Sequence, residues 1–412
     1  MTRVIHTGDT HIGYRQYHSP QRRQDFLDAF EQVIDDAIEH SVDAIIHAGD
    51  LFHDSRPGLV DISDTVAILR KLQREEIPFL GIVGNHESTR DRQWLDLFED
   101  LGLAVRLDAN GTTVNDVTFY GMDYVPVSQR EQLAYQFESP KTETTALVAH
   151  GLFEPFSHAD WDTERVLEQS SVDFDALLLG DNHIPDQAKV KGTWVTYCGS
   201  TERASASERE QRGYNLITFD DNIRITRKQI TGTRTFVFIE VELHGHDGTQ
   251  RVIDEVVSHE LSDAVVIIHV TGTGTEVVPA RIEEVAKEAG ALVVRLTDTR
   301  DQDDQSLASA QFSNPHDAVN ERIHEMNLTS VGRMVDELIR DESIPEAGIR
   351  QRVRSRIDTL LRELPEAFER PRPISSEPSS SASAPSTKQN SSGNEDGAED
   401  ESTAGQTSIG EF

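Results

Sequence analysis

Short apolar runs alternate with helical patterns along the first 220 residues. The runs predict six strands: Arg3–Thr7, Asp43–Ala48, Pro78–Val83, Thr145–Ala149, Ala176–Leu179 and Thr193–Tyr197. Apolar strands that are separated by helices are typical of sheets covered by helices. The pattern therefore predicts an α/β fold for this part of the chain.

Two helices stand out in the same stretch. Pro20–His40 begins with Ser19 as a candidate N-cap and with Pro20 in the first helical position. Its apolar residues repeat at helical spacing: Phe26, Phe30, Val33, Ile34, Ala37 and Ile38. Leu59–Glu76 has a similar pattern, carried by Val60, Val66, Ile68, Leu69 and Leu72.

The pattern changes four times after this stretch. We predict five segments: a larger α/β domain (1–225), a smaller α/β domain (230–300), a polar linker (301–316), a helical region (317–366) and an acidic Ser-rich tail (367–412). In the second segment, strands Thr235–Leu243, Ala264–Thr271 and Ala291–Leu296 alternate with helices 249–258 and 278–289. The tail has hardly any large apolar residues, and such composition predicts disorder.

The helical region contains two apolar stripes with Pro345 between them. The first stripe comprises Val331, Met334, Val335, Leu338 and Ile339, and the second comprises Ile349, Val353, Ile357, Leu360, Leu361 and Leu364. A polar linker precedes both, so we expect the pair to dock on a partner helix or coiled coil. The alternative is that the pair packs on the 230–300 segment.

The net charge of the chain indicates the kind of solution in which the protein is stable. The 412 residues carry a formal net charge of −34, and only seven of the 39 basic residues are lysine. Residues 371–412 hold seven acids and two bases, so −29 remains for the rest of the chain. Acidic residues spread over a surface repel one another, and dissolved salt screens this repulsion. The acid excess therefore predicts a halophilic protein rather than an ordinary acidic protein with an acidic tail.

Composition also limits the cellular context. Cys198 is the only cysteine, so no intrachain disulfide is possible. The N-terminus has no apolar signal core, and no run of about 18 apolar residues exists. We expect a cytoplasmic protein. The acidic charge is a weak argument against nucleic acid, because a local basic groove or bound metals can supply positive charge.

Polar residues of metal-ligand type follow one predicted strand after another. They are Asp9 and His11, then Asp50, then Asn85 and His86, then His150, and finally Asp181 and His183. A single Asp-x-His or Gly-Asp is usually a loop or a turn, but five such motifs in order are not expected by chance. Strand ends share one edge of an α/β sheet, where loops converge on a ligand.

Imidazole, carboxylate and amide ligands suit Mn²⁺, Zn²⁺ or iron rather than a thiolate site. Two divalent ions about 4 Å apart can clamp a phosphoryl group and generate a hydroxide nucleophile. One carboxylate has to bridge the two ions, and Asp50 is the natural candidate.

This set resembles the calcineurin-like metallophosphoesterase superfamily. Three segments, residues 9–14, 48–57 and 84–87, resemble more specifically the archaeal form of the Mre/SbcD family of double-strand-break repair nucleases. The resemblance is strong over residues 1–220 and weakest beyond 317. It implies a metallophosphoesterase β-sandwich flanked by helices, a DNA-capping domain at 230–300 and a C-terminal helical pair.

The resemblance also implies an activity, cofactors and partners. We expect a Mn²⁺-dependent DNA exonuclease and single-strand endonuclease with two metal ions per subunit. It would form a homodimer, bind DNA ends and single strands, associate with the nucleoid and pair with a Rad/SbcC-type ABC ATPase through the helical region. The alternatives are a DNA-end-binding scaffold with weak nuclease activity and a metallophosphoesterase for a smaller phosphodiester.

Residue roles carry over by position. Asp9, His11, Asp50 and His183 would hold one metal, and Asp50, Asn85, His150 and Asp181 would hold the other. His86 would protonate the leaving oxygen or stabilise the transition state. His53 would face the phosphate or support the ligands, or else make an ordinary polar contact.

The last motif departs from the family. The family commonly has Gly-His-x-His where this chain has Gly180-Asp181-Asn182-His183. We predict that Asp181 ligates through oxygen, which lowers the positive charge of the site and favours harder metals. The alternative is that Asp181 does not ligate and the second metal is held weakly.

Several arginines near the site-forming loops are candidates for DNA phosphate contacts. They are Arg15, Arg56, Arg90 and Arg92, with Arg22 and Arg23 as further possibilities. His47, inside an apolar strand, is expected in the core, and the three tryptophans are expected in the core or at interfaces.

Overall fold

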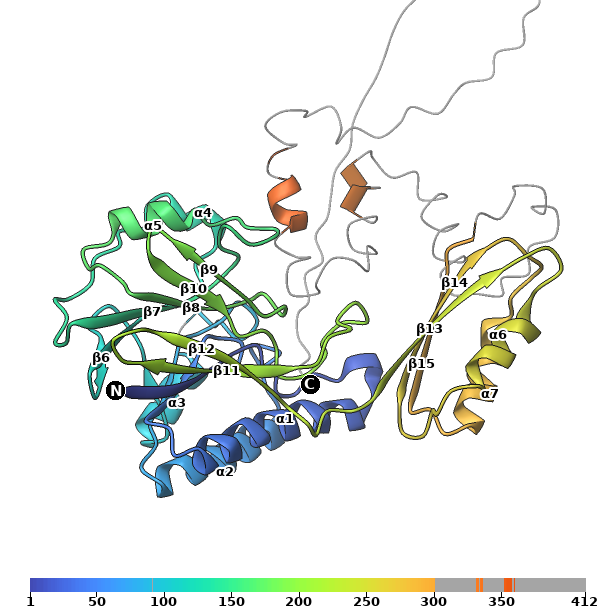
Figure 1. The fold of residues 1–412 in the computed structure, drawn as a ribbon, viewed down its shortest axis with the longest axis horizontal. Helices are drawn as coiled ribbons and strands as arrows, with labels where there is room; N and C mark the ends of the chain where they lie inside the picture. The colour runs from blue at the N-terminus through green and yellow to red at the C-terminus, as the bar shows by residue number, and fades with distance from the viewer. Residues whose placement is uncertain (91, 301–330, 333, 336–351, 358, 360–412) are drawn as a thin grey trace, which may run out of the picture. The chain divides into compact units, whose positions relative to one another are not determined.

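The computed structural model describes residues 1–300 except 91, together with 331, 332, 334, 335, 352–357 and 359 (Figure 1). Two six-stranded sheets form the larger part. The first contains, in order, β12 (Arg224–Gln229), β11 (Gly213–Phe219), β1 (Thr2–Thr7), β2 (Ala44–His47), β3 (Phe79–Gly81) and β4 (Val105–Arg106). The second contains β5 (Thr112–Val114), β6 (Val117–Met122), β7 (Thr144–His150), β8 (Ala176–Gly180), β10 (Thr193–Tyr197) and β9 (Asp186–Val190).

The two sheets pack face to face because their strands alternate apolar side chains between two cores. In β1, Val4 belongs to the core between the sheets, whereas the next residue, Ile5, belongs to the core beneath the helices. The core between the sheets also takes Val148 of β7 and Leu178 of β8, both fully buried. This arrangement is the helix-flanked β-sandwich that the family resemblance implied.

Helices α1 (Pro20–Glu39) and α2 (Leu59–Arg74) cover the outer face of the first sheet, and their ends agree with the predicted helices to within two residues. The hydroxyl oxygen of Ser19 accepts a hydrogen bond from the backbone N–H of Arg22, so the predicted N-cap is confirmed. Three shorter helices complete this part: α3 (Trp94–Asp100), α4 (Val127–Arg130) and α5 (Thr163–Gln169).

A third, parallel sheet contains β13 (Phe236–Leu243), β14 (Val265–Gly272) and β15 (Val293–Asp298). Helices α6 (Thr249–Val256) and α7 (Pro279–Glu288) lie on one side of it and share its apolar core (Figure 1). The strands and helices predicted for residues 230–300 are therefore present. The DNA-capping role of this segment stays a prediction.

The sequence pattern missed six strands of the two larger sheets. Four of them, β4, β5, β9 and β12, are the edge strands of those sheets. β9 has the sequence DQAKV and β12 the sequence RITRKQ, and both are largely exposed, so neither contains an apolar run. Edge strands can be short and charged because only one side pairs with a neighbour.

Much of the C-terminal prediction lies outside the described residues, including the linker, the tail and most of both apolar stripes. Within the described part, residues 331–332, 334–335, 352–357 and 359 are helical. No helix among the described residues is long and apolar enough to cross a membrane.

Candidate metal centre

The predicted ligands lie at the carboxyl ends of five parallel strands. β1, β2 and β3 run parallel in the first sheet, and β7 and β8 run parallel in the second. Asp9 and His11 follow β1, Asp50 follows β2, Asn85 and His86 follow β3, His150 ends β7, and Asp181 and His183 follow β8. Both sheets of the sandwich therefore contribute ligands to one edge.

Four of these residues have a backbone conformation that side chains rarely adopt. The φ angles are 49° at Asp9, 43° at His11, 57° at Asp50 and 90° at Asp181. Each such residue costs free energy unless the surroundings enforce it, and such residues cluster at functional sites. The strained turns direct consecutive strand ends toward a common centre.

Gly84 lets the turn after β3 lie directly against Asp50. A Cβ at this position would lie 2.1 Å from Oδ1 of Asp50 and 2.3 Å from its backbone nitrogen. Only a residue without a side chain lets the turn after β3 pass over Asp50. The same turn places the backbone N–H of His86 2.9 Å from Oδ1 of Asp50, as its donor.

The first group of ligand atoms combines Asp9, His11 and His183. One donor atom from each lies within 4.8 Å of the others, and all three residues are buried. The Nε2 atoms of His11 and His183 are 3.1 Å apart. Two imidazole nitrogens that face each other at this distance can both donate a lone pair to one cation.

The second group combines Asp9, Asp50 and His150, again within 4.8 Å and buried. Nδ1 of His150 donates to the carbonyl oxygen of Ala48 at 2.7 Å, so Nε2 is the nitrogen left for a metal. Nε2 lies 3.0 Å from Oδ1 of Asn85 and 3.5 Å from Oδ2 of Asp50.

Asp181 lies beside both groups. Its backbone N–H is 3.1 Å from each carboxylate oxygen of Asp9, and its own Oδ1 is 3.8 Å from Nε2 of His150. The side chain is buried. Its carboxylate is therefore within reach of the second group, although it is not part of either set of three.

The pKa values of these carboxyl groups are shifted by burial and by the charged groups beside them. Burial raises the pKa of Asp9 to about 6 and also raises the pKa of Asp181. Burial would raise the pKa of Asp50 as well, but the imidazoles of His150 and His86 outweigh it and hold the pKa of Asp50 below its ordinary value. Cations favour the charged form of such carboxylates.

His53 and His86 form the open side of the site. Both are partly exposed, as is Asn85, whereas the other predicted ligands are buried. Nδ1 of His86 donates to the carbonyl oxygen of His53 at 3.0 Å, and the ring of Tyr14 stacks on His53 at 3.8 Å between centroids. Together with His11 these two histidines make a third set within 4.8 Å, which the sequence did not predict.

The donor set fits divalent metal ions. Oδ2 of Asp50 is buried and has no hydrogen-bond partner within the described part of the chain, and a buried anionic oxygen requires a cation or a donor. Carboxylate, imidazole and amide donors without a thiolate suit Mn²⁺, Zn²⁺ or iron.

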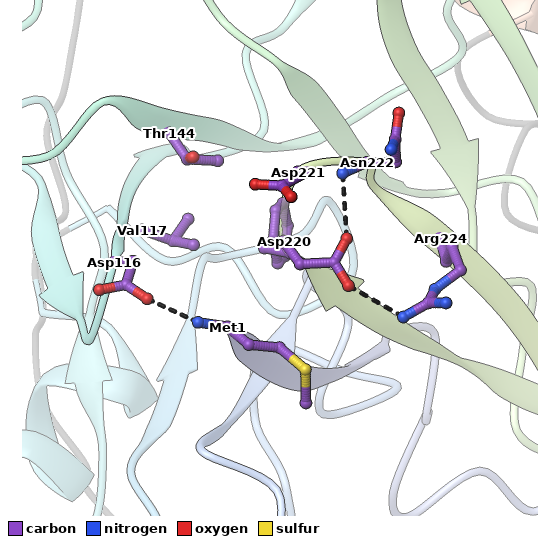
Figure 2. Close-up of a pocket in the computed structure, with 9 residues that line it drawn as sticks. Met1, Asp116, Val117, Thr144, Asp220, Asp221, Asn222 and Arg224 are labelled. Carbon is purple, nitrogen blue, oxygen red and sulfur yellow. Dashed lines mark hydrogen bonds and ion pairs between the residues drawn. The ribbon is translucent and has the colours of Figure 1, made fainter.

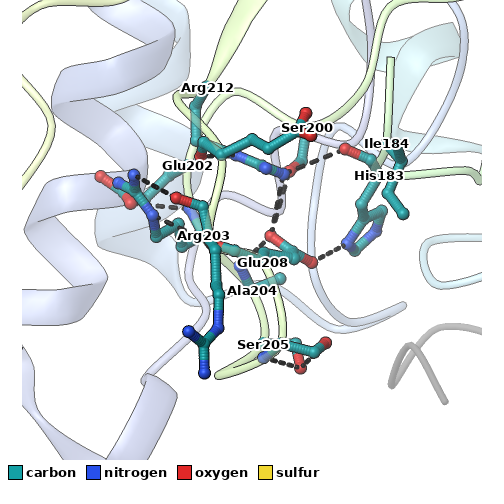
Figure 3. A network of polar contacts seen from close by, with 12 residues as sticks. His183, Ile184, Ser200, Glu202, Arg203, Ala204, Ser205, Glu208 and Arg212 are labelled. Carbon is teal, nitrogen blue, oxygen red and sulfur yellow. Dashed lines mark hydrogen bonds and ion pairs between the residues drawn. The ribbon is translucent and has the colours of Figure 1, made fainter. Parts of the chain in front are cut away.

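Two carboxylates that support the site were missed by the sequence. Glu87 is buried and accepts from the N–H groups of Phe52 and Gly84, so it joins the turns after β2 and β3. Glu208 accepts from Nδ1 of His183 at 2.8 Å (Figure 3). Glu87 could have been suspected from its place next to the Gly-Asn-His motif, whereas nothing in the sequence points to Glu208.

The arginine candidates separate into two kinds. Arg15, Arg56 and Arg90 are exposed, and Arg92 is exposed but paired with Asp100. Arg22 is fully buried between Asp25 and Glu202, so its prediction as a phosphate contact is wrong. Its guanidinium neutralises internal carboxylates and has no surface for DNA.

A surface pocket of about 530 Å³ lies away from this centre. Its lining includes Met1, Val117 and Thr144, which stand at the start of β1, β6 and β7, so it is at the opposite strand ends from the ligands. Figure 2 shows the amino group of Met1 paired with Asp116 and the guanidinium of Arg224 paired with Asp220.

Several known proteins are similar to this chain. Residues 2–185 match the calcineurin-like phosphoesterase family. The DNA double-strand break repair protein Mre11 of Haloferax volcanii is 56% identical over 370 residues, which cover 89% of this chain and 84% of that protein. The protein of the same name from Halobacterium salinarum is 52% identical over 368 residues, which cover 88% of this chain and 95% of that protein.

Among solved structures, the crystal structure of a dimetal phosphatase from Danio rerio is 10% identical in sequence. The match covers 55% of this chain and 96% of the phosphatase chain, with a TM-score of 0.39.

Proposed function

Because this chain belongs to the Mre11 family of DNA double-strand break repair proteins, we propose that it hydrolyses DNA phosphodiester bonds at a centre of two divalent metal ions. The observation that carries the proposal is the convergence of Asp9, Asp50 and His150 with His11 and His183 at one edge of the sandwich. Manganese is the metal that we propose, on the basis of this mixed oxygen and nitrogen donor set.

We assign the ligands as follows. Asp9, His11, Asp50 and His183 hold one ion, and Asp50, Asn85, His150 and Asp181 hold the other. When bound, the two ions would neutralise phosphate charge and lower the pKa of the attacking water. Oδ2 of Asp50 has no hydrogen-bond partner in the described part of the chain and lies 3.5 Å from Nε2 of His150, which supports Asp50 as a ligand that we propose to bridge the ions. Asp9 is the carboxylate that both ligand groups share.

We propose that His86 protonates the leaving oxygen or stabilises the transition state. Its Nδ1 donates to the carbonyl oxygen of His53, so Nε2 is the nitrogen that would face the leaving oxygen of the DNA. His53 supports this orientation through its backbone and through its stacking with Tyr14. The exposed Arg15, Arg56 and Arg90 are proposed to contact DNA phosphates.

The partners follow from the same proposal. We propose that the chain forms a homodimer, acts on DNA ends and single strands, and binds a Rad/SbcC-type ABC ATPase through residues 317–366. Truncation after about residue 310 should spare nuclease activity and abolish co-purification with the ATPase, and truncation after 366 should affect neither. An intact ATPase complex without these residues would refute the partner assignment.

A nuclease assay tests the central proposal. Purified protein in high KCl with Mn²⁺ should degrade a linear DNA, and chelation should stop the reaction. Asp50→Asn should keep the fold but abolish hydrolysis, since neither ion keeps its shared anionic ligand. Full activity of the folded Asp50→Asn protein would contradict the two-metal assignment, and metal binding without DNA hydrolysis in the parent protein would favour an end-binding scaffold.

A further inference from the structure

Glu208 lies in the segment 198–212, which connects β10 of the second sheet to β11 of the first. This segment therefore crosses from one sheet of the sandwich to the other. Glu208 is 6% exposed and His183, to which it binds, is 2% exposed, so their contact is shielded from water. A buried hydrogen bond of this kind holds its partners in one geometry.

The two carboxylate oxygens of Glu208 have different partners (Figure 3). Oε1 accepts from Nδ1 of His183 at 2.8 Å. Oε2 accepts from the backbone N–H of Ala204 at 3.0 Å, from Nη1 of Arg212 at 3.1 Å and from the hydroxyl of Ser200 at 3.5 Å. The same Nη1 donates to the carbonyl oxygen of His183 at 3.0 Å. Glu208 and Arg212 thus hold both the ring and the backbone of His183.

This arrangement selects one tautomer of the imidazole. A carboxylate cannot donate, so Nδ1 of His183 carries a hydrogen and Nε2 is the nitrogen left for a metal. Nε2 is the atom that lies 3.1 Å from Nε2 of His11 in the first ligand group. Residues that orient ligating histidines in this way raise metal affinity without touching the metal.

We propose that Glu208, supported by Arg212, is a positioning residue that fixes His183 in its metal-binding tautomer. The inference rests on the proposed metal centre and adds a requirement to it. This role predicts that a side chain with the shape of Glu208 but without its charge does not support metal binding. The charge is needed because it decides which nitrogen of His183 carries the hydrogen.

Glu208→Gln separates shape from charge. The amide oxygen has to face the N–H of Ala204 and the guanidinium of Arg212, since an NH₂ group cannot accept from either donor. The NH₂ group then faces Nδ1 of His183 and requires that atom to accept, which moves the ring hydrogen to Nε2. A protonated Nε2 cannot bind a cation.

Glu202→Gln is the matched control. Glu202 is buried in the same segment, where it pairs with Arg22 and accepts from the backbone N–H of Arg203 rather than from His183. Both variants lose one buried carboxylate charge from the segment. Only Glu208→Gln should affect the metal centre.

Calorimetric titration with Mn²⁺ tests the inference independently of activity. The parent protein and Glu202→Gln should bind two ions. Folded Glu208→Gln should bind one ion normally and the other with an affinity reduced by about 10- to 100-fold, and ring ¹⁵N shifts of the metal-free protein should place the hydrogen of His183 on Nε2. Unchanged affinities in folded Glu208→Gln, or an equal loss in Glu202→Gln, would overturn the role of Glu208. A parent protein that binds no Mn²⁺ would instead refute the proposed function, and thermal unfolding with circular dichroism checks that each variant is folded.

Discussion

At the scale of single residues, His86 has a partly exposed side chain whose Nδ1 donates to the carbonyl oxygen of His53. We expect His86→Ser to bind both metals and to lose turnover by about 10² to 10⁴-fold, the usual contribution of a positioned proton donor. Single-turnover cleavage with metal titration on the same sample measures both. A matching loss of metal would instead make His86 a ligand, as its proximity to His11 and His53 also permits.

Asp181 is the residue at which this chain departs from the family pattern. If its carboxylate ligates, Asp181→Ala should weaken one metal only, and excess Mn²⁺ should restore part of the activity. Asp181→His should be tolerated, because imidazole is the ligand type that the family commonly has here. Unchanged stoichiometry and affinity in the alanine variant would show that Asp181 does not ligate.

The elements of the sandwich explain why the ligands meet. Three parallel strands of one sheet and two of the other end at the same edge, and each strand is held by apolar residues on both faces. Ligands that are attached to such rigid elements need little reorganisation to bind a metal. The open side is built from the turns after β2 and β3, which Glu87 joins through backbone hydrogen bonds.

Two adjacent apolar residues of α2 are exposed in the described part of the chain. Leu59 and Val60, at its start, are 78% and 58% exposed. Adjacent exposed apolar residues are typical of an interface, and the proposed homodimer would bury them. We expect Leu59→Asp combined with Val60→Asp to convert the dimer to a monomer with normal metal content.

Light scattering coupled to size exclusion measures this change. Val257→Asp, at a 51% exposed position just after α6, is the matched control and should leave the mass unchanged. A monomeric parent protein, or a dimer that tolerates both aspartates, would exclude this face of α2 as the dimer interface.

The whole molecule carries the acid excess of a halophilic protein, and two of its relatives come from Haloferax and Halobacterium. Repulsion among surface acids destabilises the folded state, and salt screens it. We expect the melting temperature to rise as KCl increases toward molar concentrations. Differential scanning fluorimetry at constant pH measures it, and a melting temperature that stays flat or falls would contradict the halophilic interpretation.

The sequence by itself determined the order of the chemistry along the chain. The five parallel strands that lead to the ligands contain short apolar runs, and the metal-ligand residues lie at or just after their ends, so both could be recognised locally. The same holds for α1, whose N-cap and apolar spacing are local features. The halophilic composition is likewise a property of the sequence alone.

The tertiary structure decided which distant residues support these ligands. Glu208 binds His183 across 25 positions, and Arg22 binds Glu202 across 180, through a crossing segment without regular periodicity. The edge strands, too, depend on a neighbour for their pairing rather than on an apolar run of their own. Such contacts form only when the two sheets pack, because burial is what makes a carboxylate partner necessary for Arg22 and a fixed tautomer possible for His183.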